Sequence, residues 1–478
     1  MKTGLTSSGA YATASGVSAA PADPSAPSGA PPVAIPKWME GLRVYLRGRV
    51  LVVMLLGFSG GLPRTLSAST LILWMREVGV DIVTIGLFAL VGAPYALKFF
   101  WAPLVDAFDV PLLSRWLGRR RGWLLLTQIL LMAAIAFLAF CDPAGNPWKV
   151  AFGALLVAIA SATQDIVIDT FRVESLDESE QAAGVAGYVA AYRLATLVAT
   201  VGAGYLVTGF EILSFPTHEA WIGSYLVMAS LVTVGIVTTL VATEPEKSAA
   251  VEEMHAGPGP MRRLMTTVSG AFTDFVYREG MLVTIAALAF VVLFKVTDSL
   301  ADTLTPAFVL DLGFSREVYL NIIKGVGLIA TLAGGFVGGF MVKSYPLAAM
   351  LWFGGIIQAL ANFGFSWSAI VGADIPWLTF AIVIEKFTSG IGTVVFVAYL
   401  SGLCRNPLHT ATQYAVLTAL AAFGATFLAS GAGFIVESTG YAWFYVICAA
   451  AALPSFVLLA WLQWRGHFRH AGAAGISR

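Results

Sequence analysis

Residues 243–263 read TEPEKSAAVEEMHAGPGPMRR, and this stretch decides how the rest of the chain is divided. It is charged and contains Gly and Pro, so it cannot cross a lipid bilayer as a helix. The polar interruption extends to residue 281. On each side of it the sequence shows six apolar runs of roughly twenty residues. The chain therefore consists of two sets of six candidate membrane spans with a polar linker between them.

Each apolar run is long enough to cross about 30 Å of hydrocarbon as an α-helix. The composition agrees, because 58% of the residues are hydrophobic and only 12% are charged, about half the charged share of a soluble protein. We therefore predict an all-α integral membrane protein with twelve transmembrane helices in two six-helix halves. The predicted spans are 49–75, 82–104, 120–141, 150–171, 182–207 and 220–242 before the linker, and 282–310, 317–342, 347–368, 375–401, 410–437 and 441–464 after it.

Six spans on each side of a central cytoplasmic loop are the layout of the major facilitator fold, whose halves are internal repeats. We predict an N-terminal bundle over 45–242, a cytoplasmic linker over 243–281 and a C-terminal bundle over 282–464. Residues 1–44 are rich in Ala, Ser, Gly and Pro and lack the basic start and apolar core of a signal peptide. We expect them to form a disordered cytoplasmic tail, and 465–478 to form a second cytoplasmic tail.

The distribution of charge says more than the net charge, which is zero and indicates no nucleic-acid partner. Basic residues gather in the loops that face inward if both termini are cytoplasmic, as in the cluster of Arg115 with 119–121. The three cysteines form neither a disulfide framework nor a metal-binding spacing, and the five histidines lie outside the spans. The sequence thus predicts no cofactor, no metal and no enzyme activity, and an integral-membrane enzyme is the weakest alternative.

The loop between the second and third spans reads APLVDAFDVPLLSRWLGRRRGW over 102–123. Asp106 stands where the second span ends, and GRRRG opens the third, as in the loop signature of major facilitators. An Asp can pair with Arg, and such a pair breaks when the two halves rock, so we predict a cytoplasmic gate. The competing interpretation is that the Arg run only anchors the inner side of the membrane. The predicted gate consists of Lys98, Asp106, Arg119, Arg120, Arg121, Asp169 and Arg172.

The segment SATQDIVIDT, residues 161–170, carries charges inside an apolar run. Residues three or four apart share a helix face, so Ser161, Asp165 and Asp169 form one polar stripe with Arg172. Each charge that faced lipid would cost roughly 3 kcal/mol, so these groups must face the interior of the bundle. The other charges within or beside the spans are Arg64, Lys98, Arg193, Lys295, Asp298, Asp302, Lys324, Glu385 and Lys386.

At mid-depth these charges comprise more cations than anions, so a shared cavity would tolerate a substrate that carries carboxylates. Because no histidine lies in a span, carboxylates would have to carry any transported protons, and burial favours their neutral form. Two alternatives stay open: Asp165 could form a fixed ion pair with Arg193, and Lys295 could simply pair with Asp298. The mid-depth cations are Arg64, Arg193, Lys295, Lys324 and Lys386, and the anions are Asp165, Asp298, Asp302 and Glu385.

The sequence resembles the AmpG muropeptide permeases of Gram-negative inner membranes over nearly all of residues 45–462. The match rests on GFSGGLP, ALKFFWAPLVD, GRRRGWLLLTQILL, SATQDIVID and AYRL in the first half. In the second half it rests on LFKVTDSL, KGVGLIATLAGG, EKFTSGIGTVVFVAYLSGLC and TATQYAVLTALAA. Arg64 and Asp302 depart from the family pattern, because they are charged where its best-known members are expected to be apolar. Family-like positions are Lys98, Asp106, Gln164, Asp165, Asp169, Arg193, Lys295, Asp298, Lys324, Glu385 and Gln413.

The resemblance implies import of N-acetylglucosaminyl-1,6-anhydro-N-acetylmuramyl peptides from periplasm to cytoplasm, driven by protons. It also implies peptidoglycan recycling and, in some bacteria, β-lactamase induction. We expect a monomer whose partners are the muropeptide, protons and the bilayer. The alternatives are a facilitator for another bulky anion such as acetyl-CoA and a membrane sensor that does not transport. Predicted substrate-binding residues are Arg64, Gln164, Tyr192, Arg193, Lys295, Lys324 and Gln413, and predicted proton-coupling residues are Asp165, Asp298, Asp302 and Glu385.

Overall fold

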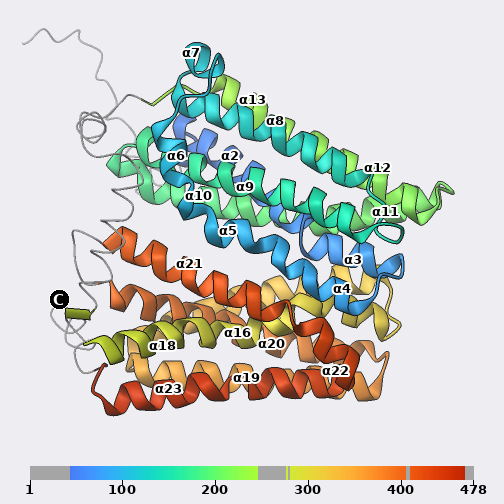
Figure 1. Ribbon diagram of the computed structural model, residues 1–478, viewed down its shortest axis with the longest axis vertical. Helices are drawn as coiled ribbons and strands as arrows, with labels where there is room; N and C mark the ends of the chain where they lie inside the picture. Colours follow the sequence, from blue (N-terminus) through green and yellow to red (C-terminus); the bar gives the residue numbers. More distant parts are fainter. Residues whose placement is uncertain (1–43, 246–275, 278–279, 405–409, 469–478) are drawn as a thin grey trace, which may run out of the picture. The chain divides into compact units, whose positions relative to one another are not determined.

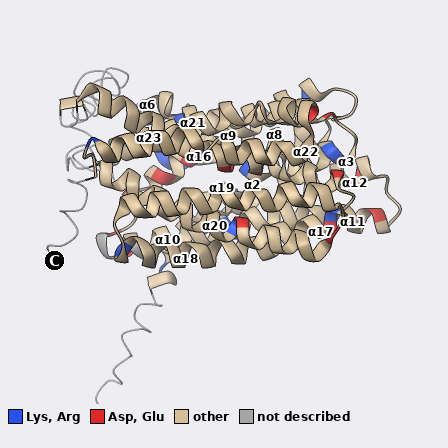
Figure 2. Ribbon diagram, turned by 90° about the horizontal axis from the view of Figure 1, so that it is seen from below, with Lys and Arg blue, Asp and Glu red and all other residues tan. Residues whose placement is uncertain are grey.

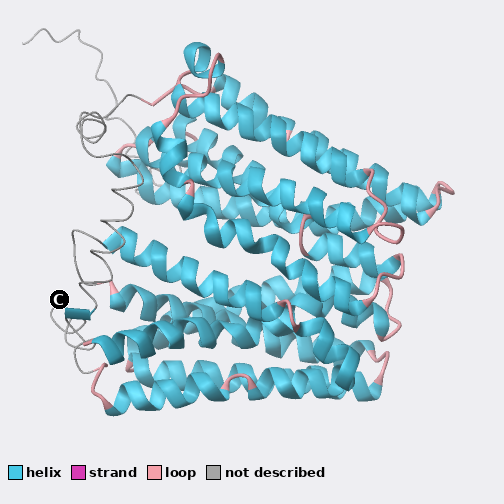
Figure 3. Cartoon of the chain, in the orientation of Figure 1, coloured by secondary structure: helices cyan, strands magenta, loops and turns pink. Residues whose placement is uncertain are grey.

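The computed structural model describes residues 44–245, 276–277, 280–404 and 410–468. The regular elements of this part of the chain are helices, and Figure 3 shows them joined by loops, with no strand among the described residues. The predicted N-terminal tail and most of the predicted linker and C-terminal tail lie outside the described residues. The predicted division into two bundles, a linker and two tails therefore stays a prediction.

The helices fall into two groups on either side of the linker, which we call the N-half and the C-half. The N-half comprises α2 (Gly48–Leu66), α3 (Ser69–Glu77), α4 (Ile82–Leu87), η1 (Phe88–Gly92), α5 (Ala93–Leu97), η2 (Lys98–Phe100), α6 (Ala102–Ala107), α7 (Leu113–Leu117), α8 (Arg119–Ala139), α9 (Pro147–Ser175), α10 (Glu178–Leu197), η3 (Val198–Gly202), α11 (Ala203–Ile212), α12 (Thr217–Leu231) and α13 (Thr233–Val241). The C-half comprises α16 (Met281–Asp311), α17 (Arg316–Val318), η4 (Tyr319–Val326), α18 (Gly327–Ser344), α19 (Leu347–Val371), α20 (Ile375–Leu403), α21 (Thr410–Ala429), α22 (Ala432–Ala450) and α23 (Leu453–Trp464).

Eleven helical segments of the described chain are long and apolar enough to cross a membrane. The last of them, Ala432–Trp464, contains a break at Gly440, where φ is 76° and ψ is 166°, a conformation that favours glycine. The residues after this break form a separate span, in agreement with the predicted boundary between 410–437 and 441–464. The part of α22 before the break continues the shorter apolar helix Val416–Ala429, which completes twelve spans.

The second span is not one continuous helix. It consists of α4, α5 and α6 with short 3-10 turns between them, and Pro94 and Pro103 stand in the first turns of α5 and α6. Proline lacks an N–H donor, so it is tolerated in the first turn of a helix but interrupts its interior. The predicted span 82–104 is therefore correct in position but not in continuity.

Helices pack mainly within their own half. In the N-half α2 packs against α10 and α8 against α9, and in the C-half α18 packs against α20 and α16 against α21. Figure 1 shows the N-half and C-half as two groups of roughly parallel helices. Contacts between the halves join α3 to α16, α4 to α22, α5 to α21 and η3 to η4.

The two ends of the helices differ in how they join the halves. At the end with loops 78–81, 213–216 and 312–315, which we call the gate end, one buried apolar cluster includes Trp74 of the N-half and Phe308 of the C-half. At the opposite end, which holds the residues next to the linker and which we call the linker end, each half has its own cluster. Figure 2 shows charged residues near both ends and a few along the middle of the bundle.

Candidate functional site

Two cavities lie between the N-half and the C-half. Cavity A has a volume of about 640 Å³ and is lined by the first two spans of the N-half and by α16, α20 and α21 of the C-half. Cavity B has a volume of about 400 Å³ and is lined mainly by α10, η3, α16, η4, α18 and α20. Ser69 and Asp302 line both cavities, so they stand in the wall that the two cavities share.

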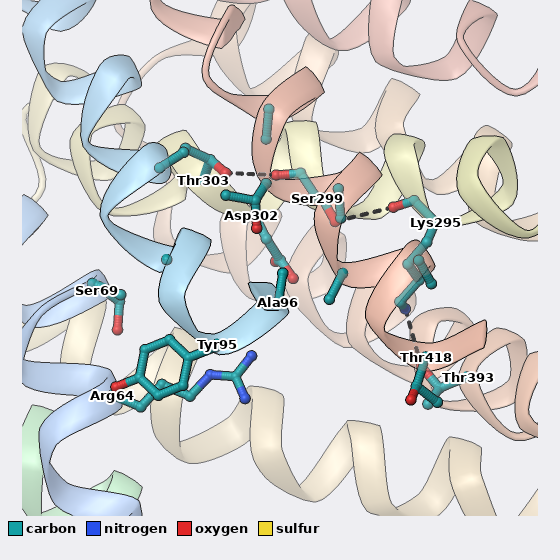
Figure 4. A pocket seen from close by; sticks show the side chains of 18 of the residues that line it. Arg64, Ser69, Tyr95, Ala96, Lys295, Ser299, Asp302, Thr303, Thr393 and Thr418 are labelled. Carbon is teal, nitrogen blue, oxygen red and sulfur yellow. Dashed lines mark hydrogen bonds between the residues drawn. The ribbon is translucent and has the colours of Figure 1, made fainter. Parts of the chain in front are cut away.

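Cavity A combines aromatic, hydroxyl and charged groups, as Figure 4 shows. The guanidinium of Arg64 lies over the ring of Tyr95, 5.2 Å from its centroid. From the opposite wall Nζ of Lys295 lies 3.4 Å from Oγ1 of Thr393. An aromatic face beside hydroxyl and cationic donors can bind a ligand that has both apolar faces and polar edges.

Lys295 is held by a buried carboxylate on its own helix. Its Nζ lies 2.6 Å from Oδ2 of Asp298, which is only 7% exposed. Asp298 also accepts hydrogen bonds from the side chains of Gln358 and, at 3.4 Å, Ser389. The pair of Lys295 and Asp298 that the sequence left open is therefore present, and it belongs to a network that joins α16, α19 and α20.

Cavity B is the more basic of the two. Nζ of Lys386 lies 2.5 Å from Oδ1 of Asp302 and 3.2 Å from Oε2 of Glu385, although the latter contact lacks hydrogen-bond geometry. Nζ of Lys324 lies 3.3 Å from Oγ of Ser69 and over the ring of Tyr319, 5.6 Å from its centroid.

Arg193 lines cavity B from α10, and it forms no ion pair with any residue that the structure describes. The interpretation that Arg193 pairs with Asp165 is therefore wrong. The cation next to Asp165 is Lys98, whose Nζ lies 4.0 Å from Oδ2. Lys98 stands in η2, where the second span is broken, and Arg193 lines cavity B from α10.

Two further predicted binding residues lie close to these groups. Gln164 is fully buried, and its Nε2 donates to Oγ of Ser59 at 2.9 Å, so it joins α9 to α2. Tyr192 is half-buried on α10, with its ring centroid 6.1 Å from that of Tyr188. Gln413 lies in α21, but its side chain is outside the described part of the structure.

Several residues of the predicted cytoplasmic gate form contacts within the N-half. Arg120 makes a two-point contact with Glu174, in which Nε and Nη2 lie 2.9 Å and 2.7 Å from the two carboxylate oxygens. Nη2 of Arg172 lies 3.6 Å from Oδ1 of Asp169. The guanidinium of Arg121 donates to the carbonyl oxygens of residues 239 and 240.

The remaining gate predictions concern three residues. Arg119 is half-buried at the start of α8. Lys98 lies beside Asp165, and the side chain of Asp106 is outside the described residues. Among the described residues at the linker end, no ion pair joins the N-half to the C-half. The gating role of these residues therefore stays a prediction.

At the gate end, ion pairs that were not predicted from the sequence do join the halves. Arg316 of the C-half is 8% exposed, and its guanidinium contacts Glu77 at 2.7 Å and Glu211 at 2.9 Å. Arg76 of the N-half forms an ion pair with Asp311 of the C-half. All three carboxylates and both cations stand at or next to span ends, where the sequence cannot separate a loop charge from a charge that bridges two bundles.

Two π-helical segments meet beside cavity B. They are η3 (Val198–Gly202) in the fifth span and η4 (Tyr319–Val326) in the eighth, and they contact one another across the halves. A π-helical turn holds an extra residue, which changes the direction of the side chains that follow, and such turns are frequent at functional sites. Lys324 belongs to η4, so the π-helix contributes to its position in the cavity wall.

Comparison with known proteins gives matches over most of the chain. Residues 53–407 match the model of the Major Facilitator Superfamily. The chain is 36% identical over 419 residues to the anhydromuropeptide permease of Escherichia coli, with 87% of this chain and 80% of that protein covered. It is 33% identical over 425 residues to the putative transporter AmpG 4 of Rickettsia conorii, with 89% and 99% covered.

Solved structures of transporters are similar in fold. A D-xylose-proton symporter superposes with a TM-score of 0.63 at 13% identity and covers 87% of this chain and 97% of its own. A POT family transporter in complex with a thioalcohol-conjugated peptide superposes with a TM-score of 0.64 at 13% identity and covers 87% and 96%. At this level of identity the likeness concerns the fold alone.

Proposed function

The chain belongs to the Major Facilitator Superfamily and, within it, to the AmpG muropeptide permease family, and from this premise we propose that it imports anhydro-muropeptides across a bacterial inner membrane. The predicted fold class, an all-α membrane protein with twelve helices in the major facilitator fold, is confirmed. Its family members are transporters, so we assign no chemical conversion to the protein. The observation that carries the proposal is the pair of cavities between the halves, whose linings combine aromatic, hydroxyl and cationic groups.

This lining suits the parts of a muropeptide. Sugar faces can pack on aromatic rings such as Tyr95, sugar hydroxyls and peptide amides can pair with Ser and Thr side chains, and carboxylates can meet Arg or Lys. Hydroxyl and cationic side chains of both halves line the cavities, so a bound substrate would contact the N-half and the C-half together. In the proposed cycle a monomer alternates between two states by rocking of the halves around the substrate.

We assign the gate end to the periplasm and the linker end, with both termini, to the cytoplasm. The basic residues Arg115 and 119–121 lie at the linker end, as positively charged loops do on the cytoplasmic side. In this orientation the contacts of Arg316 with Glu77 and Glu211 close the periplasmic side. The structure then corresponds to a state in which the substrate has no path back to the periplasm.

Proton symport is assigned to the buried carboxylates. Glu385 is 4% exposed and lies 3.2 Å from the cation of Lys386, and Asp298 is held by Lys295. A carboxylate that takes up a proton releases its lysine partner. Protonation therefore changes the charge that the neighbouring cavity presents to the substrate. The other two candidates each lie beside a lysine: Asp165, which is also buried, and Asp302, whose side chain is 52% exposed.

The test is uptake of labelled anhydro-muropeptide into right-side-out membrane vesicles with an acidic exterior. We expect accumulation that a protonophore abolishes, and we expect Glu385→Gln to lose accumulation but to keep exchange of internal for external substrate. Arg465→Gln is a matched control, because Arg465 lies at the end of α23 over the ring of Trp461, away from both cavities. Accumulation in the absence of any pH gradient would contradict proton coupling.

The same assay separates the competing functions. Uptake of labelled acetyl-CoA without uptake of labelled muropeptide would indicate a facilitator for another bulky anion. Binding of muropeptide without flux would indicate a membrane sensor. Imported muropeptide would feed peptidoglycan recycling and, in a host with an inducible β-lactamase, induction of that enzyme. Deletion of the gene should then release muropeptide into the medium and abolish induction.

A further inference from the structure

The cations of the two cavities fall into two classes. Two lysines of the cavity linings have carboxylate partners within 4.0 Å: Lys295 with Asp298, and Lys386 with Asp302 and Glu385. Three other cations, Arg64, Arg193 and Lys324, form no ion pair with described residues, although all three line a cavity.

The unpaired cations are not evenly distributed. Arg64 lines cavity A and lies over the ring of Tyr95, so an aromatic face is its neighbour. Arg193 and Lys324 both line cavity B. Arg193 is exposed and Lys324 is half-buried, and no described carboxylate lies within ion-pair distance of either, so an anionic ligand that enters cavity B would meet two cations whose charge is not paired within the described protein.

Arg193 and Lys324 also come from different halves. Arg193 is on α10 of the N-half, and Lys324 is in η4 of the C-half. Hydroxyl groups of both halves surround them, since cavity B is also lined by Thr65, Thr196 and Thr200 of the N-half and by Thr331 and Ser389 of the C-half. Hydroxyl donors beside two cations suit a carboxylate, whose two oxygens accept several hydrogen bonds at once.

We propose that cavity B is a carboxylate-binding subsite, in which Arg193 and Lys324 hold a carboxylate of the peptide part of the substrate between the two halves. Cavity A, with Arg64 and Tyr95, holds the sugar part. This inference rests on the proposed function, because it divides an anhydro-muropeptide between the two cavities. Ser69 and Asp302, which line both cavities, stand where the bound molecule passes from one to the other.

The subsite gives the substrate a direct effect on the conformation. A carboxylate bound by cations of both halves attracts the N-half and the C-half to one point, which stabilises any state in which the two cations are close. A substrate analogue without the carboxylate would lack this differential interaction. The peptide carboxylate therefore both anchors the substrate and favours closure around it.

The experiment compares two ligands on the purified full-length protein in lipid nanodiscs by titration calorimetry. One ligand is an anhydro-muropeptide with free peptide carboxylates, and the other is the same molecule with these carboxylates converted to carboxamides. The wild-type protein should bind the carboxylate form about tenfold or more tightly, because a hydrogen bond to a charged group is worth more than one to a neutral group. Arg193→Gln and Lys324→Gln should each reduce this preference, and the double variant should abolish it.

The controls separate a local effect from a general one. Affinity for the carboxamide form should stay within about twofold of wild type in Arg193→Gln and Lys324→Gln, since that form makes no charged contact. Tyr95→Ala should instead weaken both forms equally, because Tyr95 belongs to cavity A. The conservative variants Arg193→Lys and Lys324→Arg should keep the preference, which shows that the cationic charge and not misfolding explains the loss.

Two results would overturn the inference and leave the proposed function standing. One is equal affinity of the wild type for both forms, and the other is an equal weakening of both forms by the two glutamine variants. Failure of the wild type to bind either form would instead contradict the proposed function itself.

Discussion

Nε of Arg316 lies 2.7 Å from Oε1 of Glu77, and this contact joins the C-half to the N-half. The same guanidinium contacts Glu211 at 2.9 Å and lies over the ring of Trp221, 5.5 Å from its centroid. Arg316 is 8% exposed, so water competes weakly for its hydrogen bonds. One residue of the C-half thus holds three elements of the N-half at the gate end.

Removal of this cation should open the gate end. Arg316→Gln leaves two carboxylates without their partner, and breaking a buried ion pair costs about 3 kcal/mol or more. The expected result is at least a tenfold faster reaction of a cysteine in cavity A, introduced as Thr303→Cys, with an impermeant thiol reagent added outside. The measurement uses right-side-out vesicles and a background in which the three native cysteines are replaced by serine.

Arg465→Gln is the matched control for this measurement, because it removes an exposed cation far from the gate end. Glu77→Gln and Glu211→Gln should each give a smaller increase than Arg316→Gln, since Arg316 keeps one carboxylate in either variant. An unchanged labelling rate in Arg316→Gln would show that these ion pairs do not hold the gate end closed.

A close approach of two backbones should be equally important for closure. Gly86 of α4 packs against Gly433 of α22, and a Cβ on Gly86 would lie 2.7 Å from the backbone nitrogen of Gly433. A Cβ on Gly433 would collide with the carbonyl oxygen of Ile82. Because backbone atoms cannot rotate away as a flexible side chain does, Gly433→Ala should separate α4 from α22 and increase labelling of Thr303→Cys.

Gly339→Ala is the matched control for the glycine test. Gly339 lies in α18 with no atom within 4 Å of a built Cβ, so alanine there is accommodated without movement. We expect wild-type labelling for this variant. If Gly433→Ala also labelled at the wild-type rate, the contact of α4 with α22 would not belong to the gate.

The spans could be predicted from the sequence because the length and apolar composition of membrane helices identify them. The break at Gly440 is an example: the gap between 410–437 and 441–464 contains the one residue type that adopts its conformation freely. Partners were harder to predict. The sequence pointed to Arg193 on the neighbouring span as the partner of Asp165, whereas the structure places Lys98 there, in the broken part of the second span that the hydrophobic pattern hides.

The ion pairs of Arg316 with Glu77 and Glu211 could not be predicted from the sequence for a related reason. At a span end a charged side chain can stay in water, so it does not pay the free energy of placing a charge in lipid. The rule that charges within spans must face the interior of the bundle therefore does not apply there. Burial of Arg316 results from the two halves meeting, which is a property of tertiary structure. Charges deep in the spans, such as Asp298 and Glu385, were correctly expected to be buried, because exposure to lipid would be too unfavourable.

The pair of Lys295 and Asp298 allows stability to be separated from transport. Asp298→Asn leaves Lys295 without its carboxylate and should lower the stability by about 3 kcal/mol, seen as a lower midpoint of thermal unfolding in nanodiscs. Adding Lys295→Met removes the unpaired cation and should restore much of this loss. Transport should stay absent in both variants, and a double variant that transports normally would contradict a role of this pair in the cycle.

Stability at the linker end should depend on pH through Glu180. The hydrogen bond from Arg47, 2.8 Å long, lowers the pKa of Glu180 below its ordinary value. A carboxylate with a lowered folded-state pKa stabilises the protein above the unfolded-state pKa of about 4.3, and this contribution disappears as the pH falls through the folded-state value. Glu180→Gln should therefore lower the unfolding midpoint at pH 7 relative to wild type.

The difference between wild type and Glu180→Gln should shrink when both are measured at successively lower pH, down to about pH 3. Arg47→Gln should reproduce the effect, because it removes the donor that lowers the pKa of Glu180. A difference that stays constant with pH would mean that the variant acts through packing and not through ionisation.

Arg120 decides between the predicted and the observed role of the basic loop. Its guanidinium makes two contacts with Glu174 of the same half, and its side chain is only 5% exposed. If Arg120 stabilises the N-half, Arg120→Gln should lower the unfolding midpoint by an amount that corresponds to about 3 kcal/mol, and Glu174→Gln should do the same. Labelling of Thr303→Cys from the cytoplasmic side, measured in inside-out vesicles, should then match wild type. If Arg120 instead latches the two halves in another state of the cycle, the unfolding midpoint should stay near wild type while labelling from that side increases.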